Sequence, residues 1–225
     1  MELQSTEFES LMELARGEPL LRAAEVREAG LSSVTLTRAL RSGALEQVSR
    51  GLYRLPDAPW DEHLALSEVA ARVPQAVIVL VSALNFHQIG SHRAHAVSVL
   101  LRQNSGTPRI EYPSLDVIRS SKPEAFTEGV AVHLLNGISV KITSPARTVA
   151  DCFKHRSKLG LELCLEALRE TLRNGTQPRE IMSYARMNRV EKVMMPYLEA
   201  MLSKISQPQF EGGRWRNETR RDNHF

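Results

Sequence analysis

The sequence predicts an α+β protein, with a small helical N-terminal unit followed by a larger mixed α/β domain that ends in helices. Two observations support this prediction. Within residues 1–56, three short helical patterns are followed by two strand-like segments, and this order of elements is that of a winged helix-turn-helix. From residue 61 onward, helical and strand-like patterns alternate until a run of helical segments.

The bulk composition is that of an ordinary soluble globular protein. The chain has 225 residues, of which 42% are apolar and 24% charged, so one or two domains are expected. No apolar run approaches the ~18 residues that cross a bilayer, and the acidic N-terminus lacks a signal-peptide pattern. Cys152 and Cys164 have neither metal nor disulfide spacing. We therefore expect a cytoplasmic protein with no membrane partner and no cofactor.

Glycine residues and a capping serine mark the ends of the expected N-terminal elements. Gly17, Gly30 and Gly43 each follow a helical pattern, and serine precedes the third pattern, where it can cap a helix. An Arg50–Gly51 turn joins the two strand-like segments. The expected elements are a helix ending near residue 17, a helix over 23–29, a helix from 32 or 33 to about 42, and strands over 45–48 and 52–55.

A proline-containing segment at 57–60 predicts a linker. It leaves 61–202 as a second domain and 203–225 as a polar, flexible tail. Asn136–Gly137 is a strong signal for a two-residue hairpin turn. The expected helices cover 61–72, 82–89, 145–154, 161–173, 178–187 and 190–202, and the expected strands cover 76–81, 95–102, 116–120, 130–135 and 138–142.

The stretch 32–56 concentrates positive charge, with four arginines against one glutamate. On a helical wheel, Leu36, Ala39 and Leu40 face the core, and Val34, Thr37, Arg38 and Arg41 face outward. Arginine can bond guanine edges or phosphates, and threonine and valine can contact a thymine methyl group. A solvated helix face would carry the same arginines, so both interpretations stay open on these residues. The candidate DNA-binding residues are Ser33, Val34, Thr37, Arg38, Arg41, Arg50 and Arg54.

Three segments of the chain carry a family resemblance. They are AEVREAGLSSVTLTRALRSGALEQVSRGLYRLP (24–56), VLVSALNFHQIG (79–90) and ITSPARTVADCF (142–153). In this order they resemble the AbiEi-type antitoxins, the transcriptional regulators of type IV toxin–antitoxin systems. The resemblance implies a winged helix that represses its own operon by binding double-stranded operator DNA. It also implies a domain at 61–202 that counteracts a nucleotidyltransferase-like toxin in abortive phage defence, in many members without a stable complex.

Other constellations favour structural roles. His87, His92 and His95 are close in sequence, but no regular element places all three on one face and no nearby ligand completes a metal set. Ser144 reads as a helix cap before Pro145, and Arg147 and Asp151 are spaced as an i,i+4 pair. We therefore expect no metal at these positions.

Catalysis is not expected either. A nuclease would need an acidic residue beside Lys141 to accompany Asp116, and Ser139–Val140 supplies none. The chain has no glycine-rich phosphate loop and no nucleophile elbow. The tail places Trp215 among Arg214, Arg216, Arg220 and Arg221, which suits a contact with nucleic acid or with a protein partner, or a solvated segment. A protein-interaction module that inhibits a partner enzyme without binding DNA is the alternative function.

Overall fold

The computed structural model describes residues 2–58, 63–110 and 113–205. Its N-terminal region has helices on a small antiparallel sheet of strand order β1-β3-β2. Leu11, Leu21, Leu36, Leu45 and Tyr53 belong to the buried core between them. In chain order the elements are α1 (Glu2–Gly17), β1 (Leu21–Arg22), α2 (Ala23–Glu28), α3 (Ser33–Arg41), β2 (Glu46–Ser49) and β3 (Leu52–Arg54).

A second, five-stranded sheet follows, with strand order β6-β5-β4-β8-β7. The central strand β4 pairs parallel to β8 and antiparallel to β5, β6 runs parallel to β5, and β7 runs antiparallel to β8. Asn136 and Gly137 turn the last hairpin with φ of 52° and 72°, as a type I′ turn requires. The strands are β4 (Val77–Ile78), β5 (Val97–Arg102), β6 (Leu115–Ser120), β7 (Val130–Leu135) and β8 (Ile138–Thr143).

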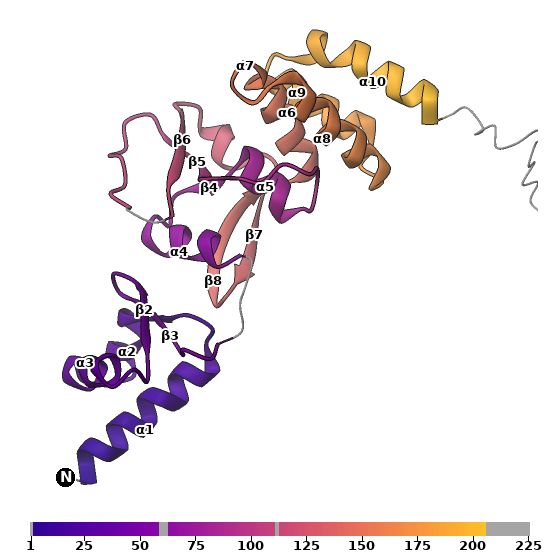
Figure 1. The fold of residues 1–225 in the computed structure, drawn as a ribbon. Coiled ribbons are helices and arrows are strands. Elements are labelled where there is room, and N and C mark those ends of the chain that lie inside the picture. The colour runs from indigo at the N-terminus through magenta and orange to yellow at the C-terminus, as the bar shows by residue number, and fades with distance from the viewer. Residues whose placement is uncertain (1, 59–62, 111–112, 206–225) are drawn as a thin grey trace, which may run out of the picture.

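Helices cover both faces of this sheet (Figure 1). On one face, Leu66 and Val69 of α4 pack on Val99 and Ile142. On the other face, α5 and α6 lead into a helical layer whose core includes Phe153. The helices of this region are α4 (Leu64–Arg72), α5 (Leu80–Phe86), the 3₁₀ helix η1 (Pro123–Phe126), α6 (Pro145–Lys154), α7 (Arg156–Leu159), α8 (Leu161–Arg173), α9 (Pro178–Met187) and α10 (Glu191–Ile205).

The two regions are in contact. Leu20, from the turn after α1, is 1% exposed and belongs to the same buried core as Ile138 at the start of β8. Val48 of β2 packs against that core as well. The β7–β8 turn and strand β2 therefore connect the N-terminal region to the second sheet.

The α+β fold class is confirmed, since the described part of the chain has many helices and two sheets. The expected strand over 76–81 is wrong at its end, because β4 stops at Ile78 and Leu80 starts α5 with a φ of 50°. The elements β1, η1 and α7 were not predicted, and α10 continues past residue 202 to Ile205. The arginines and Trp215 of the tail lie outside the described residues. Of the helices in the described part, none is both long and apolar enough to cross a bilayer.

Candidate nucleic-acid interface

Helix α3 has one buried face and one exposed face. Thr35, Leu36 and Ala39 are buried, and Leu40 is half-buried, so the predicted inner face is confirmed with Thr35 added to it. The outer face carries five of the candidate DNA-binding residues, and Val34 among them is 67% exposed. All five are exposed: Ser33, Val34, Thr37, Arg38 and Arg41.

The start of α3 is held by its own cap and by helix α1. Ser32 is the N-cap, and its Oγ accepts a hydrogen bond from the Thr35 amide at 3.2 Å. The Glu7 carboxylate of α1 accepts from Thr35 Oγ1 at 2.7 Å and from Ser32 Oγ at 3.0 Å. These bonds, that of Thr35 first, lower the pKa of Glu7. The sequence pattern did not reveal Glu7, because its partners lie 25 and 28 residues away.

The hairpin β2–β3 separates its two arginines. Arg50 is exposed at the turn, and Gly51 beside it has a φ of 80°, which glycine adopts at little cost. Arg54 lies at the other end of β3, opposite Glu46 in the strand register. Its Nε and Nη2 each lie 3.3 Å from Glu46 Oε2. Arg50 thus points into solvent from the tip, whereas Arg54 is part of a cross-strand ion pair.

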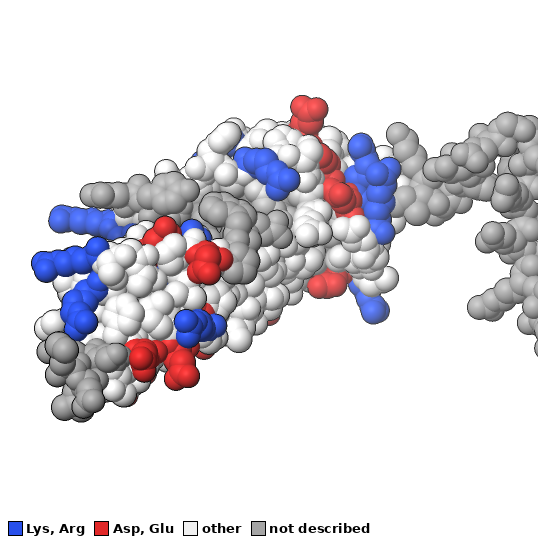
Figure 2. All heavy atoms as spheres, turned by 60° about the horizontal axis from the view of Figure 1, so that its bottom comes forward, with Lys and Arg blue, Asp and Glu red and all other residues white. Residues whose placement is uncertain are grey.

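The exposed arginines leave an excess of positive charge on this surface. Arg41 and Arg50 make no ion pair with any of the residues that the structure describes. Figure 2 shows Lys and Arg side chains gathered at one end of the N-terminal region, with Asp and Glu on the neighbouring flank. Such a surface can contact phosphates through arginine and present Val34 and Thr37 to base edges.

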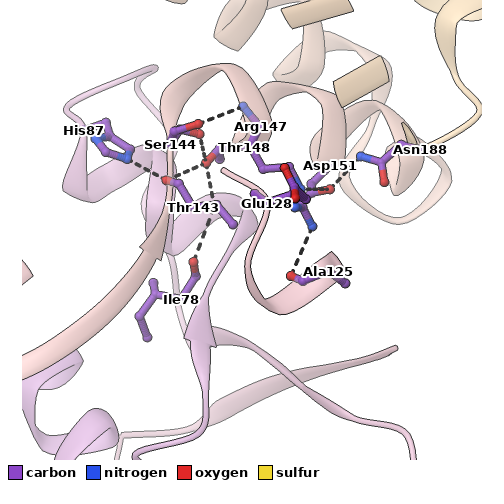
Figure 3. A network of polar contacts seen from close by, with 10 residues as sticks. All are labelled: Ile78, His87, Ala125, Glu128, Thr143, Ser144, Arg147, Thr148, Asp151 and Asn188. Atoms are coloured by element: carbon purple, nitrogen blue, oxygen red, sulfur yellow. Dashed lines mark hydrogen bonds and ion pairs between the residues drawn. The ribbon is translucent and has the colours of Figure 1, made fainter. Parts of the chain in front are cut away.

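The motif at the start of α6 forms an interior network (Figure 3). Ser144 caps the helix by accepting from the Arg147 amide at 3.4 Å. Arg147 is 3% exposed, and its Nε lies 3.0 Å from Asp151 Oδ2. Its other nitrogens donate to the carbonyl oxygens of Glu128 and Ala125, and the Asn188 amide donates to Asp151 Oδ1 at 2.7 Å. The predicted cap and i,i+4 pair are confirmed, and the pair is buried.

His87 and the two cysteines occupy structural positions. His87 Nε2 lies 2.8 Å from the carbonyl oxygen of Thr143, and burial lowers the pKa of this imidazole. Cys152 and Cys164 are buried free thiols, and burial raises the pKa of Cys164 to about 11. In the described ranges, no group of three histidine, cysteine or acidic side chains could hold a metal ion.

The two residues considered for a nuclease site lie on different strands of the second sheet. Asp116 in β6 forms an ion pair with Lys158, and Lys141 in β8 donates to the carbonyl oxygen of Pro74 at 3.4 Å. Because β5 and β4 lie between β6 and β8, three strand spacings, or about 14 Å, separate the two strands. The fold does not bring these residues together as a metal-dependent site would require.

Comparison with protein families bears on the N-terminal region. Residues 9–56 match the family described as transcriptional regulator, AbiEi antitoxin. The AbiEi resemblance is confirmed for these residues. The matched segment contains α3, the β2–β3 hairpin and all seven candidate DNA-binding residues. The AbiEi match supports, in general terms, an antitoxin and transcriptional regulator that binds DNA.

A solved structure shares the fold over most of the chain. It is the crystal structure of the RV2827C protein from Mycobacterium tuberculosis, with a TM-score of 0.56 and 16% sequence identity. The similarity covers 88% of this chain and 81% of that one, so it extends well beyond the AbiEi segment. At this identity it shows a common fold. No curated protein matches the chain.

Proposed function

We propose that the protein is an antitoxin and transcriptional repressor of its own operon. Residues 1–56 would form a winged helix, with α3 as the recognition helix and the β2–β3 hairpin as the wing, and residues 61–202 would form the antitoxin domain after a linker at 57–60. The observation that carries the proposal is the outer face of α3, where Arg38 and Arg41 accompany an exposed Val34 within the AbiEi segment.

The proposed operator contacts divide by position. Thr37, Arg38 and Arg41 would enter the major groove with Val34, and Ser33 would meet a phosphate at the helix N-terminus. Arg50 at the wing tip would enter the minor groove. Arg54 belongs to the proposed set with a smaller contribution, because part of its charge is already compensated by Glu46.

Binding to the DNA upstream of its own gene tests the repressor. Fluorescence anisotropy at low salt should show specific binding, and Arg38→Ala combined with Arg41→Ala should weaken it by at least ~10-fold. The slope of log K against log salt concentration should become less steep by about two, because each arginine removed means that about one counterion fewer is released on binding. Arg173→Ala combined with Arg179→Ala is the matched control, since these two arginines are exposed in the C-terminal helices and the change in net charge is the same.

Two outcomes would contradict the repressor. Absence of any specific complex at low salt, where phosphate contacts are strongest, would overturn DNA binding and favour the protein-interaction module. An equal loss in the two double variants would show that only net charge matters and that α3 is not the reader. Circular dichroism should show both double variants folded, since all four arginine side chains are exposed.

We further propose that the domain at 61–202 counteracts a nucleotidyltransferase-like toxin without catalysis of its own. A reading frame of that type beside this gene supplies the protein to test. Co-expression of the full chain should restore growth of cells that express the toxin, and the Arg38→Ala, Arg41→Ala variant should protect equally well. Toxicity that persists beside well-expressed, folded antitoxin would overturn this part of the proposal.

A further inference from the structure

A hollow of about 260 Å³ lies beside the second sheet, away from α3. The start of α4 and helix α5 form one side of it, through Leu66, Ser82 and Phe86, and the segment leading into β5 forms the other, through Arg93 and His95. This volume is close to the lower limit of small-molecule sites, which begin at ~300 Å³. The hollow therefore suits a ligand of a few tens of atoms rather than a polymer.

The ionisable lining of this hollow is cationic or neutral. Among the described residues that line it, the ionisable side chains are Arg93, His63 and His95, and none is a carboxylate. Arg93 is exposed and forms no ion pair with any described residue. An anion entering the hollow would thus meet a guanidinium with free donors and, among the described lining residues, no carboxylate to repel it.

The loop that carries Arg93 is held at both ends. The Asn85 amide brackets the arginine, because its Nδ2 donates to the carbonyl oxygen of His92 and its Oδ1 accepts from the Ala94 amide at 2.9 Å. Just before Arg93 in the chain, the Glu166 carboxylate accepts from the Ser91 amide at 2.9 Å and pairs with His92 Nδ1 at 3.1 Å. These bonds fix the backbone on both sides of Arg93, and a backbone that is ordered before a ligand arrives reduces the entropic cost of binding.

The side of the hollow that is formed by α5 and the start of α4 adds an aromatic surface. The Phe86 ring is half-buried and lies 5.0 Å from the His63 ring, centroid to centroid, at a tilt of 54°. Ser114 supplies an exposed hydroxyl group nearby, whereas the Ser82 hydroxyl is already bonded to the Ala96 carbonyl oxygen and the Ser98 amide. The lining thus combines a surface for a planar ring, a few polar groups and one unpaired arginine.

We propose that this hollow binds a nucleoside monophosphate or a ligand of the same chemistry. The phosphate contacts Arg93 and His95, and the planar ring lies against Phe86 and His63. This site is separate from the proposed operator contacts and does not depend on them.

Calorimetric titration of the full chain with AMP, GMP, CMP and UMP, and with inorganic phosphate, tests the site. At least one nucleotide should bind saturably and more tightly than inorganic phosphate. Arg93→Gln should weaken it about 10-fold, the loss expected for one charge-assisted contact. Arg173→Gln, which removes an exposed arginine from the end of α8, should leave binding unchanged.

A second variant separates the ring from the phosphate. Phe86→Leu should weaken nucleotide binding and leave the binding of inorganic phosphate unaltered, with the melting temperature recorded to show that it is folded. Absence of saturable binding of all four nucleotides at millimolar concentration would overturn the proposal. Phosphate binding as tight as that of every nucleotide would overturn the ring contact, and equal losses in the two arginine variants would overturn the assignment to this hollow.

Discussion

The arginines of the proposed DNA-binding surface and the buried arginine of α6 are placed in opposite ways. On α3 and the β2–β3 hairpin, Arg41 and Arg50 are exposed and form no ion pair with the described residues. In α6, Arg147 is buried, and its guanidinium donates to Asp151 and to two backbone carbonyl oxygens. An unpaired exposed guanidinium can bind a phosphate, whereas a buried one with its donors used stabilises the fold. The arginine variants below test this contrast.

The largest expected effect follows removal of the buried arginine. Arg147→Ala leaves the Asp151 carboxylate buried with the Asn188 amide as its remaining side-chain partner, which should lower the free energy of unfolding by about 3–5 kcal/mol. Chemical denaturation measures this loss. Asp151→Ala added to Arg147→Ala should restore part of it, because no charge is then left unpaired.

Arg186→Ala is the matched control for that variant. Arg186 also pairs with a carboxylate, Glu191, with Nε 2.8 Å from Oε1, but its side chain is 64% exposed. Its removal should cost no more than about 1 kcal/mol. Equal losses at Arg147 and Arg186 would show that burial does not separate the two kinds of arginine.

The next largest expected effect is a difference in operator affinity between variants of the two hairpin arginines. Arg50→Ala removes an exposed guanidinium at the tip and should weaken operator binding by about 1–2 kcal/mol, or roughly 5- to 30-fold. Arg54→Ala removes a side chain already paired with Glu46 and should weaken binding less than 3-fold, within the range of a surface ion pair. Anisotropy titrations of both variants on one operator fragment measure the difference. A larger loss at Arg54 would mean that the base of the hairpin, and not its tip, meets the DNA.

Some of these placements could be predicted from the sequence. The helices at Pro145–Lys154 and Pro178–Met187 begin at a proline, which suits the first helical position and so marks the boundary. The outer face of α3 follows from the helical period alone. Helix spacing also predicts the Arg147–Asp151 pair, but its burial depends on the Glu128 segment and on α9, which are brought there by the tertiary fold.

Other features could not be predicted from local patterns. Residues 76–81 are apolar throughout, and such a run does not distinguish a strand from the start of a buried helix, so Leu80 and Val81 were assigned to the wrong element. Strand β1 has two residues and exists because it pairs with β3. The pairing of Arg54 with Glu46 could have been inferred, because the predicted hairpin register places the two residues opposite each other.

The two serine N-caps also allow the two regions to be compared, with smaller expected effects. Ser32→Ala and Ser144→Ala each remove a cap and should each lower stability by about 1 kcal/mol. Ser32 also donates to Glu7 at the start of the proposed recognition helix, so its loss should weaken operator binding as well. Ser144 starts α6 in the other region, and its loss should leave operator affinity unchanged. Thermal melts and anisotropy on both variants test this, and an unchanged affinity for Ser32→Ala would show that Thr35 and Glu7 hold α3 without it.

The smallest expected effect is the pH dependence that Glu7 contributes. Its pKa is lowered in the folded protein, chiefly by the Thr35 hydroxyl, so the ionised carboxylate stabilises the fold above the ordinary glutamate pKa of about 4.3. That stabilisation is lost as the pH falls from this value through the folded pKa. Melting temperatures between about pH 6 and pH 3 should therefore decline less steeply in Glu7→Gln than in the wild type, whereas Glu13→Gln, an exposed position on the same helix, should follow the wild type. Identical profiles for Glu7→Gln and wild type would mean that the hydrogen bonds between Glu7 of α1 and the start of α3 do not depend on the charge of Glu7. The start of the proposed recognition helix would then be held by the Ser32 cap and by apolar packing.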